Sequence, residues 1–102
     1  DGEVLHLAGF DIKVLHTPGH TVGGCCYYIP KEAVIFTGDT LFAQSVGRTD
    51  LEGGSMSQLV RSIQEKILAL TETGNQDTDI TVYPGHNDIT TIETERKYNP
   101  YL

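Results

Sequence analysis

Two neighbouring segments of the chain are apolar on both faces of an expected strand, and this pattern restricts the folds available to it. They span residues 25–29 (CCYYI) and 33–37 (AVIFT), and residues 30–32 (PKE) join them as an expected hairpin. A strand with two apolar faces belongs to a sheet that is covered on both sides. The sheet therefore needs one layer of structure above it and another below it.

Further strands are expected at 3–7, 10–14 and 81–83. In residues 10–14 the apolar side chains alternate with polar ones, which is the period of a strand. Thr17-Pro18-Gly19 follows this strand, and Pro84-Gly85 follows the last one, so both are expected to end in tight turns.

One long helix is expected to begin at Ser55, which has Gln58 at the capping-box spacing. Its apolar residues recur at the helical period, and Gly74 is expected to end the segment. The apolar stripe consists of Met56, Leu59, Val60, Ile63, Ile67 and Leu70.

A second, short helix is expected to begin at Thr90, where Glu93 repeats the capping pattern, and to stop before Pro100. The two helices can cover one face of the sheet, and the sequence offers nothing to cover the other. The sequence therefore predicts a missing half, or a self-association that supplies a second layer.

The net charge of −7 makes nucleic acid and anionic membrane surfaces poor partners. No apolar run approaches the roughly 20 residues that span a bilayer, and no signal peptide is recognisable at the start. The 102 residues suit one domain at most, and the absence of Met before Asp1 suggests that residues 1–102 are a fragment.

The two cysteines, Cys25 and Cys26, are adjacent and build no disulfide framework, which favours a reducing, cytoplasmic location. We interpret both as small buried apolar residues, and a metal role is the alternative.

Three loops that each follow an expected strand carry residues able to bind a metal. They are His16-Thr17-Pro18-Gly19-His20-Thr21, Phe36-Thr37-Gly38-Asp39-Thr40-Leu41 and Tyr83-Pro84-Gly85-His86-Asn87. Gly or Pro stands beside the candidate ligands and makes turns that hold a side chain at the end of a strand. Imidazole and carboxylate donors suit a borderline cation such as zinc.

The motifs HTPGHT, FTGDTLF and YPGH, in this order, resemble the later metal motifs of the metallo-β-lactamase superfamily, in its glyoxalase II-like branch. The resemblance extends through residues 45–51 (SVGRTDL), 53–55 (GGS), 90–92 (TTI) and 99–100 (NP), and so covers the chain from about Phe10 onward. The first motif of the family, H-x-H-x-D-H, is absent from the sequence.

The resemblance implies the second half of an αβ/βα sandwich, an α/β fold with one mixed sheet and helices on one of its faces. It also implies that His20 binds a first metal ion, that His86 binds a second, and that Asp39 bridges the two. His16 is not a ligand in this pattern, and we expect a structural hydrogen bond for it. His6 has no motif around it and is expected to be structural as well.

The chemistry implied by the resemblance is the hydrolysis of a small-molecule thioester or ester. Two zinc ions supply hydroxide near neutral pH, one of them polarises the substrate carbonyl, and Asp39 takes part in catalysis by holding the two ions at their separation. Several true β-lactamases have a cysteine at the position of Asp39, so the aspartate favours a substrate other than an antibiotic.

Arg48 lies where glyoxalase II-like enzymes use a basic residue to bind the carboxylate of glutathione. The alternative is that Arg48 pairs with Asp50 and only holds the loop. Asp50 and Asp88 stand where glyoxalase II has tyrosines, which argues against a glutathione substrate.

Two other functions remain open. One is an iron-dependent persulfide dioxygenase of the same superfamily, which shares the Gly-Arg-Thr-Asp loop and the Asn-Pro ending but has P-A-H where this chain has Pro84-Gly85-His86. The other is a non-catalytic fragment with a vestigial site, because without the first motif each metal ion keeps about two protein ligands. For the chain by itself we expect weak zinc binding or none, no activity, and a possible homodimer through the uncovered face of the sheet.

Overall fold

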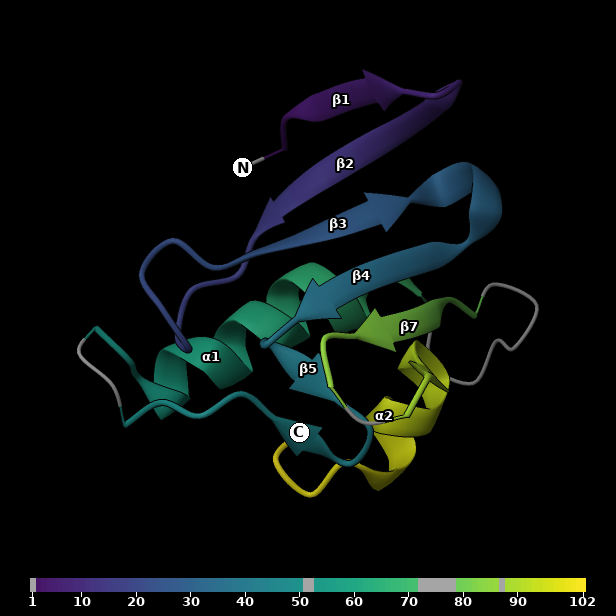
Figure 1. The fold of residues 1–102 in the computed structure, drawn as a ribbon. Helices are drawn as coiled ribbons and strands as arrows, with labels where there is room; N and C mark the ends of the chain where they lie inside the picture. Colours follow the sequence, from purple (N-terminus) through teal and green to yellow (C-terminus); the bar gives the residue numbers. More distant parts are fainter. Residues whose placement is uncertain (1, 51–52, 72–78, 87) are drawn as a thin grey trace.

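A six-stranded mixed sheet forms the centre of the computed structural model, which describes residues 2–50, 53–71, 79–86 and 88–102 (Figure 1). The order along the sheet is β1 (Val4–Leu7), β2 (Phe10–His16), β3 (Cys25–Ile29), β4 (Val34–Gly38), β7 (Thr81–Pro84) and β8 (Thr90–Thr91). Neighbouring strands are antiparallel except β4 and β7, which are parallel. The predicted mixed sheet is confirmed, and the expected strand ends are correct to within one or two residues.

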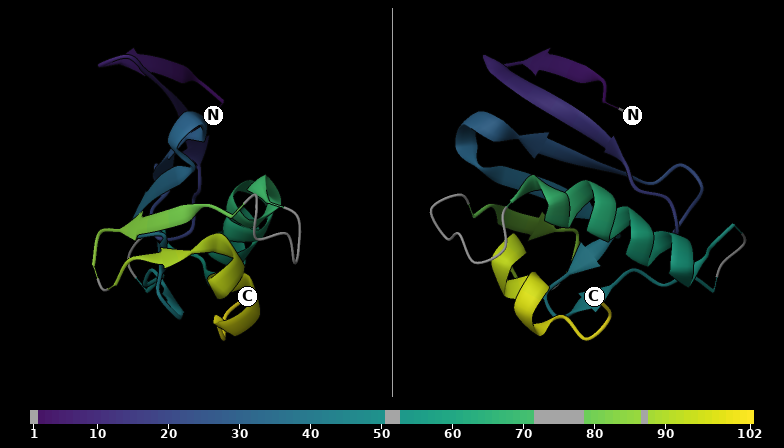
Figure 2. Two further views of the ribbon diagram at one scale, coloured as in Figure 1. Left: turned by 90° about the vertical axis from the view of Figure 1, so that its right-hand side faces the viewer. Right: turned by 180° about the vertical axis from the view of Figure 1, so that it is seen from behind.

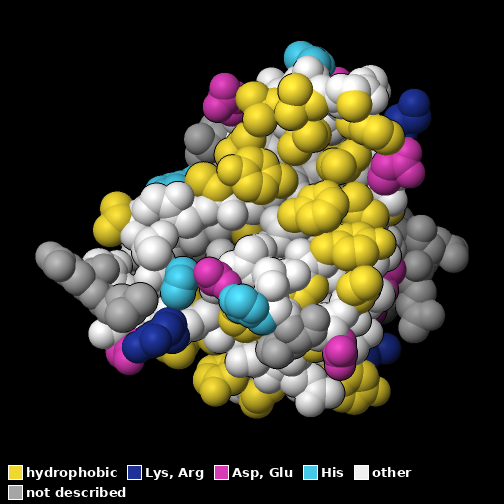
Figure 3. Space-filling model, in the orientation of Figure 1, with side chains coloured by type: hydrophobic (Ala, Val, Ile, Leu, Met, Phe, Trp, Pro, Cys, Tyr) yellow, Lys and Arg dark blue, Asp and Glu magenta, His cyan; other side chains and the backbone are white. Residues whose placement is uncertain are grey.

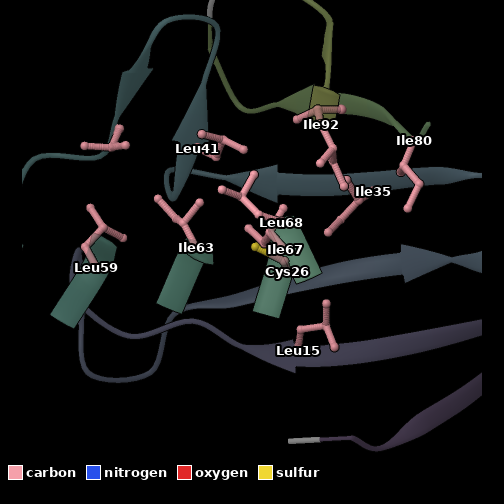
Figure 4. Packing of buried hydrophobic residues seen from close by; sticks show 12 residues of the cluster. Leu15, Cys26, Ile35, Leu41, Leu59, Ile63, Ile67, Leu68, Ile80 and Ile92 are labelled. Atoms are coloured by element: carbon pink, nitrogen blue, oxygen red, sulfur yellow. The ribbon is translucent and has the colours of Figure 1, made fainter. Parts of the chain in front are cut away.

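One face of the sheet forms the hydrophobic core. Directly paired residues of neighbouring strands point to the same face, so the pairings of Leu15 with Cys26 and of Ile35 with Val82 place all four side chains on one side. All four are buried, and they lie in the cluster shown in Figure 4.

The opposite face of the sheet is also apolar, and the described helices do not cover it. The paired residues Val14, Tyr27, Phe36 and Tyr83 lie on this face. Tyr27 and Phe36 are each 44% exposed, and Tyr83 is 37% exposed. Figure 3 shows this side of the molecule as a broad band of hydrophobic side chains. The prediction that the central strands are apolar on both faces is confirmed.

The long helical segment follows the predicted start but not a uniform helical geometry. The Ser55 hydroxyl caps α1 (Met56–Ser62) by accepting a hydrogen bond from the Gln58 amide at 3.3 Å. The segment continues as a π-helix (Ile63–Ile67) and a 3-10 turn (Leu68–Leu70). Gly74, which we expected to end it, lies outside the described residues.

The apolar stripe of this segment covers the core face through Leu59, Ile63 and Ile67, which are fully buried. The placement of Met56 on the stripe is wrong, since its side chain is 41% exposed. Met56 is the first helical residue, one turn before Leu59, where burial of the stripe begins.

The second helix, α2 (Ile92–Tyr98), begins one residue later than predicted. Its cap is Thr91, whose hydroxyl accepts from the Thr94 amide at 3.2 Å, and not Thr90. Pairing of Thr81 with Thr91 keeps Thr91 extended in β8, so the helix cannot begin until Ile92. The helix ends before Pro100, as expected.

Both helices lie on the same side of the sheet, as Figure 2 shows. A separate hairpin of β5 (Leu41–Phe42) and β6 (Ser45–Val46) follows β4. Among the helices that the structure describes, none has the length and apolar character needed to cross a membrane.

Candidate metal centre

Three loops meet at one edge of the sheet and bring His20, Asp39 and His86 together. β2, β4 and β7 run in the same direction, because β3 is antiparallel to both β2 and β4, and β4 is parallel to β7. The loops after these strands therefore leave the sheet at the same end. The three side chains line one pocket of about 290 Å³. The predicted convergence is confirmed, whereas their role as metal ligands remains a prediction.

The carboxylate of Asp39 lies between the two imidazoles. Its Oδ2 is 3.8 Å from Nε2 of His20, and its Oδ1 is 3.4 Å from Nε2 of His86. Each oxygen thus faces a different histidine. This arrangement suits a carboxylate that gives one oxygen to each of two metal ions.

The donor set fits part of a two-metal site. Nitrogen and carboxylate oxygen are donors that zinc and iron both accept. Within the described ranges, no three His, Cys, Asp or Glu side chains come close enough to hold a single ion. His20 and His86 would each contribute a nitrogen beside one oxygen of Asp39, and a catalytic zinc normally has three protein ligands. The three side chains are therefore fewer than two complete metal sites would need.

A main-chain contact fixes the ring of His20. Its Nδ1 donates a hydrogen bond to the carbonyl oxygen of Arg48 at 2.7 Å. A carbonyl oxygen can only accept, so Nδ1 carries the proton and, in the neutral ring, the free lone pair is on Nε2, the nitrogen 3.8 Å from Asp39. Such a partner sets the tautomer that a metal-binding histidine needs.

The family model of the metallo-beta-lactamase superfamily matches residues 1–86. The chain belongs to this superfamily. It is 48% identical over 103 residues to an uncharacterized protein of Mycobacterium leprae, which it matches with 100% of its own length and 44% of that protein's. It is 41% identical over 102 residues to the hydroxyacylglutathione hydrolase GloC of Haemophilus influenzae, with 100% of this chain and 45% of that protein covered.

Solved structures of the superfamily share the fold of this chain. The BLEG-1 B3 metallo-beta-lactamase superposes with a TM-score of 0.85 and 47% identity, over 96% of this chain and 44% of the other. TTHA1623 in a di-iron-bound form superposes with a TM-score of 0.78 and 40% identity, over 89% of this chain and 42% of the other. The chain thus spans less than half the length of the relatives it matches, and it has the α/β fold of roughly half of a metallo-beta-lactamase domain.

The pocket lining also includes Phe42 and Gly47, which the sequence analysis did not identify as site residues. The ring of Phe42 lies against that of His86, with centroids 6.0 Å apart and planes at 48°. Gly47 lies so close to Asp39 that a Cβ there would be 1.8 Å from the Asp39 carbonyl oxygen. The glycine between Val46 and Arg48 was the available signal for this close approach.

Arg48 lines the pocket and also pairs with Asp50. Its Nε and Nη2 donate to the two carboxylate oxygens at 2.7 and 2.9 Å. The pair lowers the pKa of Asp50 and raises that of Arg48, in each case chiefly through the hydrogen bonds between them. The pairing we considered is confirmed, and binding of a substrate carboxylate by Arg48 remains a prediction.

The other histidines have structural partners. Nε2 of His16 donates to the Val22 carbonyl at 2.9 Å, which is the kind of contact predicted for it. Nδ1 of His6 lies 2.6 Å from Asp11, and both side chains are exposed.

The two cysteines differ in their surroundings. Cys26 is fully buried as predicted, and burial raises the pKa of its thiol. Cys25 is only half-buried, because neighbouring strand residues point to opposite faces and only the face of Cys26 is covered.

Proposed function

We propose that this chain supplies part of the active site of a zinc-dependent hydrolase of the glyoxalase II-like type, acting on a thioester or ester. The observation that carries the proposal is the position of Asp39 between His20 and His86 in one pocket. When bound, two zinc ions make hydroxide available near neutral pH and polarise a carbonyl. The 41% identity to a hydroxyacylglutathione hydrolase supports this substrate class.

Each side chain of the pocket would have a separate role. His20 presents Nε2, because Arg48 holds its Nδ1, and His86 presents Nε2 from the opposite side of Asp39. Asp39 would fix the separation of the metal ions. Arg48 is the cation of the pocket lining and would hold an anionic group of the substrate, in competition with Asp50.

A β-lactam is the second candidate substrate. A structure 47% identical to this chain is described as a B3 metallo-beta-lactamase. The aspartate at position 39, where several true β-lactamases have a cysteine, favours the thioester.

Iron is the alternative metal, and a persulfide dioxygenase is the alternative activity. A di-iron form of a relative 40% identical to this chain shows that iron occurs in this superfamily. The Pro84-Gly85-His86 motif favours the hydrolase. Metal analysis of the whole protein, purified without added metal, distinguishes zinc from iron.

The activity test uses the whole protein with three kinds of substrate in parallel: thioesters with and without a glutathione group, the β-lactam nitrocefin, and glutathione persulfide with oxygen uptake as the readout. We expect thioester hydrolysis that falls at least about 100-fold in Asp39→Asn and His86→Ala, because each loses a metal ligand. His6→Ala, an exposed histidine paired only with Asp11, is the control. Thioester hydrolysis that is absent, or unaffected by Asp39→Asn, would refute the proposal, and the other two substrates show which activity replaces it.

A further inference from the structure

A buried carboxylate holds the β5–β6 hairpin, which contacts His86 and leads directly to the residue that supports His20. Glu95 of α2 has no exposed surface, although its side chain is acidic. Its Oε1 accepts from the Gln44 amide at 2.6 Å and from Nδ2 of Asn99 at 3.0 Å. Its Oε2 accepts from the Thr90 hydroxyl at 2.7 Å. Both oxygens therefore have donors, as burial of a carboxylate requires.

These bonds fix the turn of the β5–β6 hairpin. Leu41 pairs with Val46 and Phe42 with Ser45, so the turn consists of residues 43 and 44. Gln44 has a φ of 59°, an unusual conformation for a residue other than glycine. The main-chain amide of Gln44 donates the hydrogen bond to Glu95 described above. Nδ2 of Asn99 also donates to the Ser45 carbonyl, at 3.0 Å. Glu95 and Asn99 thus hold the turn and the start of β6.

The same hairpin leads to both histidines. Phe42 lies in β5 and contacts the ring of His86. After β6 the chain continues through Gly47 to Arg48, whose carbonyl holds Nδ1 of His20. A displacement of the hairpin would therefore move the supports of two rings that enter the pocket from different loops.

We propose that Glu95 is a positioning residue of the metal centre, which it stabilises through the β5–β6 hairpin without touching a ligand. The inference rests on the proposed metal function. Loss of a partner that orients a ligand directly commonly lowers metal affinity about 10- to 100-fold, and Glu95 acts one step further out, through the hairpin. In Glu95→Ala the amide of Gln44 and the Thr90 hydroxyl lose their acceptor, and the hairpin is free to shift.

Two variants separate positioning from stability. Glu95→Gln keeps one carbonyl oxygen for Gln44 and Asn99, and its amide can donate to the Thr90 hydroxyl, which is able to accept. It should retain zinc affinity. Glu93→Gln is the matched control, because Glu93 is a buried carboxylate of the same helix, 3% exposed, and it pairs with Arg96 of that helix. It should lower thermal stability and leave zinc affinity unchanged.

The first measurement is zinc affinity of the whole protein by chelator competition, with the d–d spectrum of the cobalt(II) form as a geometric readout. We expect Glu95→Ala to bind zinc at least about tenfold more weakly and to alter the spectrum, with Glu95→Gln and Glu93→Gln near wild type. Wild-type affinity and spectrum in folded Glu95→Ala would overturn the inference, as would an equal loss in Glu93→Gln.

The second measurement is the tautomer of His20 in the metal-free protein, read from ¹⁵N shifts of the imidazole. The wild type and Glu95→Gln should show Nδ1 protonated, and Glu95→Ala should show a mixture of tautomers. If the wild type binds no zinc, the proposed function fails, and this measurement still decides the inference. An unchanged tautomer in Glu95→Ala overturns it.

Discussion

Gly47 packs against the main chain of Asp39 more closely than any other residue could, since a Cβ at position 47 would lie 1.8 Å from the Asp39 carbonyl oxygen. The amide of Gly47 donates to the Thr40 carbonyl at 3.0 Å, so the two segments are also hydrogen-bonded. The loop that presents the candidate bridging carboxylate and the loop that supports His20 are therefore one packed unit.

From this contact we predict that Gly47→Ala impairs the metal centre. The added methyl group forces the loops apart, at a cost of about 1–3 kcal/mol in the free energy of unfolding. Zinc affinity should fall about tenfold, because Asp39 moves relative to His20. Urea unfolding and chelator competition measure the two effects. Gly23→Ala is the control, since a Cβ there meets nothing within 4 Å. Wild-type zinc affinity in Gly47→Ala would contradict the prediction.

The pair of Arg48 and Asp50 predicts a pH dependence. The folded-state pKa of Asp50 lies below its ordinary value, so its contribution is present above the unfolded pKa and is lost as the pH falls through the folded pKa. Because both side chains are exposed, the effect on stability is small and salt reduces it. A carboxyl NMR titration should give a midpoint for Asp50 below that of a model aspartate, and Arg48→Ala should raise it. If the titration midpoint of Asp50 is the same in the wild type and in Arg48→Ala, the two side chains do not pair in solution.

If Arg48 binds an anionic substrate, as we propose, Asp50 competes with that substrate for it. Asp50→Asn should therefore lower KM for a thioester that carries a carboxylate and change KM little for a neutral ester. Arg48→Ala should raise KM for the anionic substrate alone, since it removes a cation from the pocket lining. Steady-state kinetics on the two substrates check both changes. An equal effect on the neutral ester would show that Arg48 only holds the loop.

The cysteines should differ in reactivity. Burial raises the pKa of Cys26, so its thiol is protonated at neutral pH and inaccessible to an alkylating reagent. In the isolated chain, iodoacetamide should label Cys25 first, and Cys26 only after unfolding. Mass spectrometry of the digested protein locates the label. Labelling of Cys26 under native conditions would show that the core around Thr17 and Cys26 opens.

The sequence predicted the candidate ligands because their signals are local. His20, Asp39 and His86 each stand beside Gly or Pro after a strand, and strand direction then brings them to one edge. The supports of the site carry no such signal. The acceptor for Nδ1 of His20 is a main-chain carbonyl, 28 residues away, which no residue type reveals. Glu95 could not be distinguished from a solvated helix residue until its burial was known.

The errors in the predicted elements have the same origin. Thr90 and Thr91 are equally able to cap a helix, and the pairing of Thr91 with Thr81 in the neighbouring strand, which keeps Thr91 extended, decides between them. Met56 fits the helical period, but it is the first residue of the helix and its side chain remains exposed, whereas Leu59 in the same turn is buried. Local pattern determines the kind of element, and long-range packing determines where it begins and which residues it buries.

The uncovered face of the sheet presents aromatic residues from three adjacent strands. Tyr27 pairs with Phe36, and Phe36 pairs with Tyr83, whose ring lies 5.4 Å from that of Phe36. Contiguous apolar surface of this kind usually marks an interface. In the whole protein we expect the remaining half of the domain to cover it, since this chain spans under half the length of its relatives.

For the isolated chain we predict self-association at micromolar concentrations, because a second copy is then the available cover and a two-fold contact would bury the same strands of both copies. The alternative is loss of order in the loop over residues 40–54, which hydrogen exchange would detect. Phe36→Lys places a charge at the centre of the face and should yield a monomer by size-exclusion chromatography with light scattering. Val22→Lys adds the same charge at a residue that is 69% exposed in a loop outside the sheet, and should leave association unchanged. A monomeric wild-type chain with a protected 40–54 loop would refute the prediction and show that one covered face suffices for a stable core.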